Sequence, residues 1–212
     1  MQPDTVDHKT DLKDKIFEIG RTLAALEPGA LAELRREQPD AMAPHPAYFW
    51  RLAARHKLYP SDETRWVRII RIMAILTEKG NSEGKKSPHA AKSHANGWRG
   101  LGAALCDGAD TSWGASQSDP RPMLSELRFA RLLAAKGEMR AVLMERAARA
   151  LAAKKPAGAG VDCIDLAKFL LYDTDPVPAR NLARDYYARL DRSRNANASD
   201  DAEIPSDTGD NV

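Results

Sequence analysis

The residues with the clearest chemical potential are arginines that recur at helical spacing. Arg65, Arg68 and Arg71 stand at every third position of an otherwise apolar segment. A guanidinium is always charged, and its planar fork of donors fits two oxygens of a phosphate group. The spacing therefore indicates phosphate contact, although the same side chains could instead pair with glutamates across helix surfaces.

Other basic residues belong to the same hypothesis. Arg35 and Arg36 end a short apolar segment, so at least one must face solvent. We expect that replacing both costs little stability and weakens nucleic-acid binding for all sequences alike. The candidate nucleic-acid-binding residues are Arg35, Arg36, Arg65, Arg68, Arg71, Lys85, Lys86, Arg99, Arg128, Arg131, Arg146 and Arg149.

Residue patterns typical of catalysis are missing or incomplete. The GKKS segment resembles the end of a phosphate-binding loop, but Lys79 stands where that loop needs glycine and Lys86 where it needs a hydroxyl. His89 and His94 lie in a polar segment without a nearby carboxylate or cysteine pair, so we expect solvated loop residues rather than metal ligands. Neither HExxH nor GxSxG occurs. We expect no enzymatic activity, no metal and no cofactor.

The formal net charge of +2 is unevenly distributed. Residues 198–212 hold five acidic residues and no Lys or Arg, so residues 1–197 carry a formal charge of +7. Within residues 121–155, nine basic residues face three acidic ones. Such an excess attracts polyanions, although a run of charge is also typical of a solvated helix face. The charge distribution favours a nucleic-acid partner without requiring one.

Composition favours an all-α protein. Alanine and leucine are abundant, whereas isoleucine and valine are too few for a multi-stranded sheet. Cys106 and Cys163 have no CxxC partner, which favours reduced structural thiols. No apolar run approaches the roughly 20 residues of a membrane span, and the first residues lack the apolar core of a signal peptide. We therefore expect a cytoplasmic protein without membrane contact.

Hydrophobic periodicity predicts a bundle of about eight or nine helices, which could divide into two packed lobes. The segment over residues 63–79 should be the most buried. Asp162 is placed to begin a helix, and Asp173 and Asp175 flank a turn between two others. The predicted helices are residues 10–27, 30–37, 46–59, 63–79, 100–108, 123–135, 138–154, 161–173 and 176–190.

Three segments lack the helical pattern. We expect residues 1–9 to be a flexible N-terminus, residues 10–190 to form one helical domain, and residues 191–212 to be a disordered acidic tail. Residues 80–97 form a long basic loop without apolar periodicity. A connection of this length is either functional or disordered.

The order of the helical segments is similar to a known family, CasB, the small subunit of the type I-E CRISPR surveillance complex Cascade. Each motif alone is weak, because helical Leu/Arg strings are common, and the specificity lies in their order, spacing and total length. The matching motifs are GALAELRR from Gly29, HPAYFWRLAARH from His45, RIIRIMAILTEKG ending at Gly80, GLGAAL from Gly100, SELRFARLLAA from Ser125, VDCIDLAKFLL from Val161 and LARDYYARL from Leu182.

The resemblance implies a non-catalytic helical bundle of two lobes, of which two copies associate inside Cascade. There they bind the guide-loaded backbone and stabilise the unwound DNA strands of the R-loop, in antiviral defence. The implied partners are the CRISPR guide RNA, the target DNA, the backbone and large subunits of Cascade, and a second copy as a dimer. The basic positions of the family best match Arg35, Arg36, Arg71, Arg128, Arg146 and Arg149.

Two positions depart from the family pattern. Ala103 stands where an arginine is expected, so one possible phosphate contact is missing. Cys163 stands where the family favours tryptophan, which affects core packing rather than function.

Two other functions are considered on the residues alone. A helical adaptor could use the same basic face to bind an acidic protein partner. Salt-dependent binding of DNA or RNA in competition with an acidic protein would distinguish the adaptor from a nucleic-acid-binding subunit. A transcription regulator is disfavoured, because no helix-turn-helix with a polar recognition helix is evident.

Overall fold

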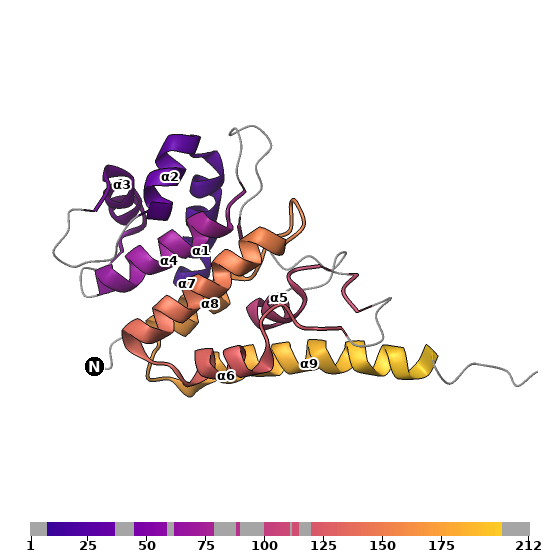
Figure 1. Ribbon diagram of the computed structural model, residues 1–212. Coiled ribbons are helices and arrows are strands. Elements are labelled where there is room, and N and C mark those ends of the chain that lie inside the picture. Colours follow the sequence, from indigo (N-terminus) through magenta and orange to yellow (C-terminus); the bar gives the residue numbers. More distant parts are fainter. Residues whose placement is uncertain are drawn as a thin grey trace, which may run out of the picture.

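A computed structural model describes residues 8–36, 45–58, 62–78, 88–89, 100–110, 112–114 and 120–200. Within these ranges the chain forms nine helices and no strand, which confirms the predicted all-α bundle (Figure 1). The helices are α1 (His8–Ala25), α2 (Pro28–Arg36), α3 (Ala47–His56), α4 (Glu63–Leu76), α5 (Leu101–Asp107), α6 (Glu126–Ala134), α7 (Gly137–Lys154), α8 (Cys163–Leu171) and α9 (Pro176–Asp200).

Helix α4 is the centre of the bundle, as its apolar sequence predicts. Ten of its fourteen residues are buried, among them Ile69, Ile70 and Met73. A helix with apolar residues on nearly every side must be covered on every side. Helices α1, α2, α7 and α8 all contact it and provide that cover.

The remaining helices pack below this group in the view of Figure 1. Helices α5, α6 and α9 lie together there, and α7 and α8 connect them to α1–α4. Tyr186 of α9 stacks on Phe129 of α6 with ring centroids 4.0 Å apart, and its hydroxyl donates to the Leu124 carbonyl at 2.6 Å. The buried apolar residues form one continuous cluster across both groups of helices.

Two ends of the predicted domain differ from the structure. Helix α9 continues to Asp200, ten residues beyond the predicted helix end at Leu190 and into the segment predicted as tail. The helix is held beyond Leu190, because Ser193 is buried and its hydroxyl donates to the Leu190 carbonyl at 2.7 Å. Helix α1 begins at His8, two residues before the expected Thr10. Residues 201–212 lie outside the described part of the chain.

His89 corrects another prediction. Most of residues 80–97 lie outside the described ranges, but Pro88 and His89 are described and buried, and His89 forms an isolated parallel bridge with Val161. The Cys163 amide donates to Nδ1 of His89 at 3.2 Å. The prediction of a solvated His89 was therefore wrong. A contact between a side chain and a distant backbone amide leaves no periodic signal in the sequence.

Two aspartates organise the beginning of α8. Asp162 accepts from the Ile164 and Asp165 amides at 2.8 and 3.3 Å, which confirms its predicted place at the helix start. Asp165 accepts a backbone hydrogen bond from Leu101, the first residue of α5. Burial, with a smaller contribution from Asp162, nevertheless raises the pKa of Asp165 to about 6.

No helix in the described part of the chain is long and apolar enough to cross a membrane.

Replacing Gly102 by alanine should destabilise the fold. Helix α5 meets α9 backbone to backbone there, because an added Cβ would overlap the Leu182 carbonyl and lie 3.0 Å from the Tyr186 amide nitrogen. Backbone atoms cannot move aside cheaply, so we expect a loss of about 1 to 3 kcal/mol in the free energy of unfolding. Urea unfolding measures the loss. The matched control is Gly29→Ala in α2, which has open space around the added Cβ and should be neutral or stabilising. Equal effects of the two changes would contradict the close approach.

Replacing Asp165 by asparagine should stabilise the protein at neutral pH. A folded-state pKa of about 6 means that the folded protein holds this proton more tightly than the unfolded chain, so stability falls as pH rises from about 4 to 6. The amide side chain of the variant would keep an acceptor for Leu101 without the charge. We expect a gain of about 2 to 3 kcal/mol at pH 7.5 that disappears near pH 4, measured by urea unfolding. Asp14→Asn, at an exposed position of α1, controls for the loss of one negative charge.

Candidate nucleic-acid interface

Arg35 belongs to the interior of the structure rather than to its surface. It lies at the C-terminal end of α2, and its guanidinium donates to the carbonyls of Ala74, Thr77 and Glu78 at 2.9, 2.7 and 3.4 Å. Ala74 belongs to the last turn of α4, where helix carbonyls have no partners of their own, and Thr77 and Glu78 follow the helix directly. Burial lowers the pKa of Arg35. The side chain therefore joins α2 to α4 by capping α4.

Arg71 extends this connection from α4 to α7. Its Nε donates to the Arg35 carbonyl at 3.3 Å, and its Nη2 lies 3.2 Å from Oε1 of Glu145 in α7. The same oxygen accepts from Nε and Nη2 of Arg149 at 3.1 and 3.0 Å. Glu145 thus holds one nearly buried arginine and one arginine whose side chain is 51% exposed. We call Arg35, Arg71, Glu145 and Arg149 the arginine network.

Arg65 and Arg68 also have partners within the protein. Nη1 of Arg65 donates to the Leu171 carbonyl at 2.9 Å and to Asp62 at 3.3 Å. Nη2 of Arg68 forms an ion pair with Glu138 of α7. Arg68 and Arg71 therefore face α7, whereas Arg65, whose side chain is 47% exposed, reaches the end of α8 from the edge of the bundle.

Four of the predicted residues are free to meet a partner. Arg36, Arg128, Arg131 and Arg146 are exposed, and the described part of the chain offers none of them a hydrogen bond or an ion pair. Arg128 and Arg131 share one side of α6, as Arg146 and Arg149 do on α7, since residues three apart lie on the same helix face. Lys85, Lys86 and Arg99 lie outside the described residues.

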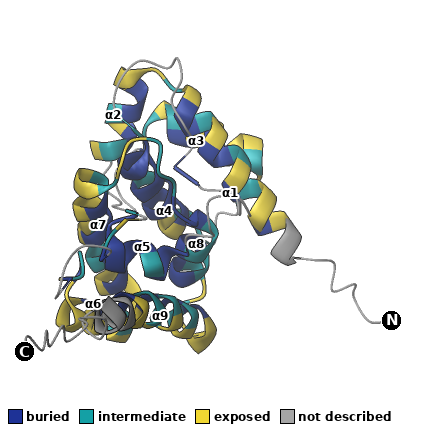
Figure 2. Cartoon of the chain, turned by 90° about the vertical axis from the view of Figure 1, so that its right-hand side faces the viewer, coloured by how far each residue is buried: buried dark blue, intermediate teal, exposed yellow. Residues whose placement is uncertain are grey.

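The helices that carry these arginines lie on the same side of the molecule. In Figure 2, α2, α7 and α6 follow one another from top to bottom along one edge, whereas α1 lies toward the opposite edge. The arginine network fixes α2 and α7 relative to each other through α4. The basic side chains therefore extend over several helices rather than forming one compact cluster.

Two further exposed lysines of this region were not predicted from the sequence, because they belong to no recognisable motif. Lys136 directly precedes α7 and Lys154 is its last residue, and both are exposed. Their only signal was the local excess of positive charge. Arg140 and Arg189 were missed for the opposite reason, since each pairs with an aspartate far along the chain: Arg140 with Asp173 at 3.1 Å and Arg189 with Asp107 at 2.7 Å.

The geometry offers little for metal or thiol chemistry. Among the described residues, no group of three or more His, Cys, Asp or Glu side chains is placed to hold a metal ion. Cys106 and Cys163 are free and buried, and burial raises the pKa of the Cys163 thiol. A protonated, inaccessible thiol is a poor nucleophile. What the described surface presents is a set of unpaired guanidinium groups.

Comparison with known proteins identifies the family. The sequence model of the family described as CRISPR-associated protein Cse2 matches residues 30–187, most of the chain. The chain belongs to the Cse2 family. Neither curated proteins nor solved structures gave a match. The predicted resemblance to CasB, the type I-E Cascade small subunit, is confirmed, because Cse2 denotes the same family.

Membership of the Cse2 family gives the chain a role in a type I-E Cascade complex, in which Cse2 is a structural subunit. The two departures from the family pattern fall at packed positions. Ala103 is half-buried in α5, and Cys163 is fully buried at the beginning of α8. Position 103 is only partly accessible to solvent. At position 163, a tryptophan would need core side chains to move, because Cys163 has no exposed surface.

Arg35→Ala and Arg36→Ala should behave differently, contrary to the sequence-based expectation for the pair. Arg35→Ala leaves carbonyls at the end of α4 without a donor, so we expect a loss of about 2 to 3 kcal/mol in stability. Arg36 is exposed, so Arg36→Ala should change stability by less than about 0.5 kcal/mol. Chemical unfolding of the two single variants measures both effects. Arg35→Ala as stable as the parent would show that the cap is unimportant.

Proposed function

We propose that this Cse2 protein is a non-catalytic nucleic-acid-binding subunit of Cascade, which contacts the backbones of guide RNA and target DNA and thereby stabilises the R-loop. The observation that carries the proposal is the set of exposed arginines without internal partners, Arg36, Arg128, Arg131 and Arg146. A guanidinium with all its donors free can bind two phosphate oxygens at once. The half-exposed Arg149 adds a fifth cation beside Arg146.

Contact with the sugar-phosphate backbone of the nucleic acid is sufficient for such a role. In an R-loop, guide pairing supplies the sequence specificity and exchanges one duplex for another of similar stability. Protein contacts to phosphates can therefore shift the balance without reading bases. Aromatic residues make up only 6% of the chain, and among the described ones Phe17, Trp50, Tyr172 and Tyr187 are exposed, so few rings are available for base stacking. The formal charge of +7 on residues 1–197 supports this sequence-independent contact.

The other proposed partners are protein subunits. Cascade contains backbone and large subunits, and a second copy of this chain would form a dimer within the complex. Leu127, Met139 and Val177 are at least half exposed at the surface of α6, α7 and α9. Exposed apolar side chains beside cations suit a protein contact next to a nucleic-acid contact.

Replacing Arg128, Arg131 and Arg146 together by glutamine should weaken nucleic-acid binding without unfolding the protein. Each lost phosphate contact releases one counterion fewer, so the slope of log affinity against log salt should fall by about 2 to 3 units. Affinity should fall about equally for oligonucleotides of different sequence. Fluorescence anisotropy from roughly 50 to 200 mM salt measures the slope, and the melting temperature should stay that of the parent.

A charge-matched variant distinguishes an effect of this particular surface from an effect of the net charge of the protein. Lys13, Arg21 and Arg55 lie on α1 and α3 and are exposed, and their triple change to glutamine removes the same charge. The two triple variants should differ clearly in salt slope. Equal loss in both would refute a defined interface. Parent protein that binds an acidic protein but no oligonucleotide would favour the adaptor function instead.

A further inference from the structure

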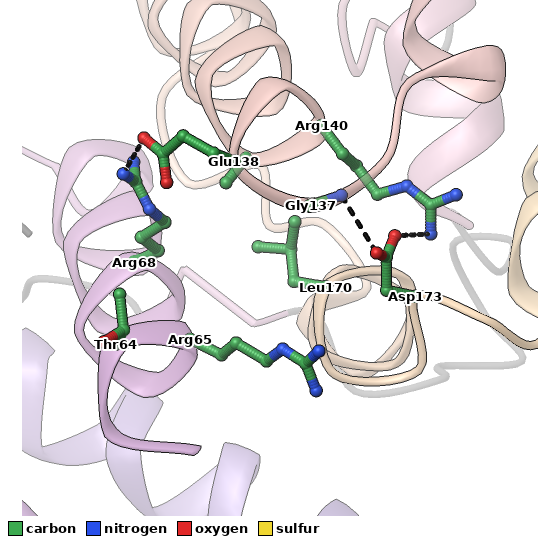
Figure 3. A pocket seen from close by; sticks show the side chains of 9 residues that line it. Thr64, Arg65, Arg68, Gly137, Glu138, Arg140, Leu170 and Asp173 are labelled. Carbon is green, nitrogen blue, oxygen red and sulfur yellow. Dashed lines mark hydrogen bonds and ion pairs between the residues drawn. The ribbon is translucent and has the colours of Figure 1, made fainter. Parts of the chain in front are cut away.

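A cavity of about 210 Å³ opens between the first turns of α4, the N-terminal turn of α7 and the end of α8 (Figure 3). Helix α4 forms one wall, and α7 and the residues after α8 form the other. Its charged side chains come from three separate segments of the chain. The polar residues that line it are Thr64, Arg65, Arg68, Glu138, Arg140 and Asp173.

Arg68 forms part of this wall, and its donors are incompletely used. Only 9% of the residue is exposed. Its Nη2 pairs with Glu138, but Nε is buried and has no hydrogen-bond partner among the described residues. Nε and Nη2 form the side of the guanidinium that fits two oxygens of one anion. Glu138 therefore occupies half of a two-oxygen site.

Three other arginines of the described chain use this side completely. Nε and Nη2 of Arg35 both donate to carbonyls, those of Arg149 both donate to Glu145, and those of Arg189 donate to Asp107 and to the Trp113 carbonyl. A buried donor without a partner costs about 1 to 3 kcal/mol. Among the described residues, Nε of Arg68 is the one buried guanidinium nitrogen without a hydrogen-bond partner, and it belongs to a residue that lines the cavity.

The charges around the cavity leave room for an anion. Asp173 is paired with Arg140, whose Nη1 lies 3.1 Å from Oδ1, and its Oδ2 accepts from the Gly137 amide at 2.9 Å, although Oδ1 has no hydrogen-bond partner among the described residues. Glu138 is 66% exposed and can turn toward solvent. Arg65 has 47% of its side chain exposed at the edge of the cavity. If Glu138 turns away, Arg65 and Arg68 are the cations that face the space.

We propose that this cavity binds one phosphate group of a nucleic-acid backbone, with Nε and Nη2 of Arg68 as its deepest donors and Glu138 as the internal competitor. The volume is below the range of about 300 to 1,000 Å³ that drug-sized ligands need, so it suits a single tetrahedral group rather than a whole nucleotide. The phosphate would belong to the nucleic acid of the proposed function, so this inference rests on that function. The site itself is separate from the exposed arginines of α2, α6 and α7 described above.

Glu138→Gln is the sharpest test, because it removes the competing charge at an exposed position. Anisotropy with a single-stranded oligonucleotide at low salt should show binding about two- to fivefold tighter than for the parent. Glu18→Gln is the matched control, since Glu18 pairs with Arg21 on α1 and lies outside the cavity. Arg68→Lys keeps the charge but loses the two-donor side, so adding it to Glu138→Gln should cancel the gain. Equal tightening by Glu138→Gln and Glu18→Gln would overturn the proposal.

Inorganic phosphate separates this proposal from the proposed function. At matched ionic strength, phosphate should raise the melting temperature of the parent more than chloride does, and this difference should shrink in Arg68→Lys. If phosphate acts so while no variant binds oligonucleotide, the cavity is an anion site and the nucleic-acid function is wrong. If oligonucleotide binds but neither Glu138 nor Arg68 alters it beyond the Glu18 control, the nucleic-acid function stands and the cavity proposal is wrong.

Discussion

The structure depends on how the cations of a buried helix are neutralised. Helix α4 is covered on nearly every side, yet it carries Arg65, Arg68 and Arg71. A buried charge without a partner would cost several kcal/mol. Carboxylates and carbonyls from α2, α7 and α8 meet these side chains, so the contacts that pair these charges also set where the neighbouring helices lie, even though Nε of Arg68 stays without a hydrogen-bond partner among the described residues.

This requirement divides the arginines of the chain into two populations. Arg35, Arg71 and Arg140 hold helices together from within, and Arg36, Arg128 and Arg146 remain at the surface of the same helices or their neighbours. The formal charge does not distinguish the two populations, because both contribute equally to it. A Cse2 protein can therefore be rich in arginine and still leave a limited number of guanidinium groups free at its surface.

The helices could be predicted largely from sequence, since their apolar periodicity and capping residues act over one or two turns. Asp162 and the apolar residues of α4 are examples. For the candidate site, the sequence could predict which residues are cationic but not which of them pair inside the protein and which stay exposed. Whether Arg71 meets Glu145 depends on residues more than seventy positions apart, and the buried place of His89 depends on the Cys163 amide. Neither pairing leaves a local pattern, because tertiary packing decides it. The last ten residues of α9 could not be predicted as helix, because they have no periodic apolar residues.

The carbonyl of Arg35 accepts from Arg71, and Arg36 follows it directly in the chain. The position of a surface cation is thus set by a hydrogen bond inside the bundle. A genetic screen for defective interference would recover substitutions in the arginine network as readily as substitutions of the surface arginines, although only the latter change the exposed face directly. Maps of functional importance for this protein would therefore extend from the surface into the core along the chain of contacts from α7 through α4 to α2.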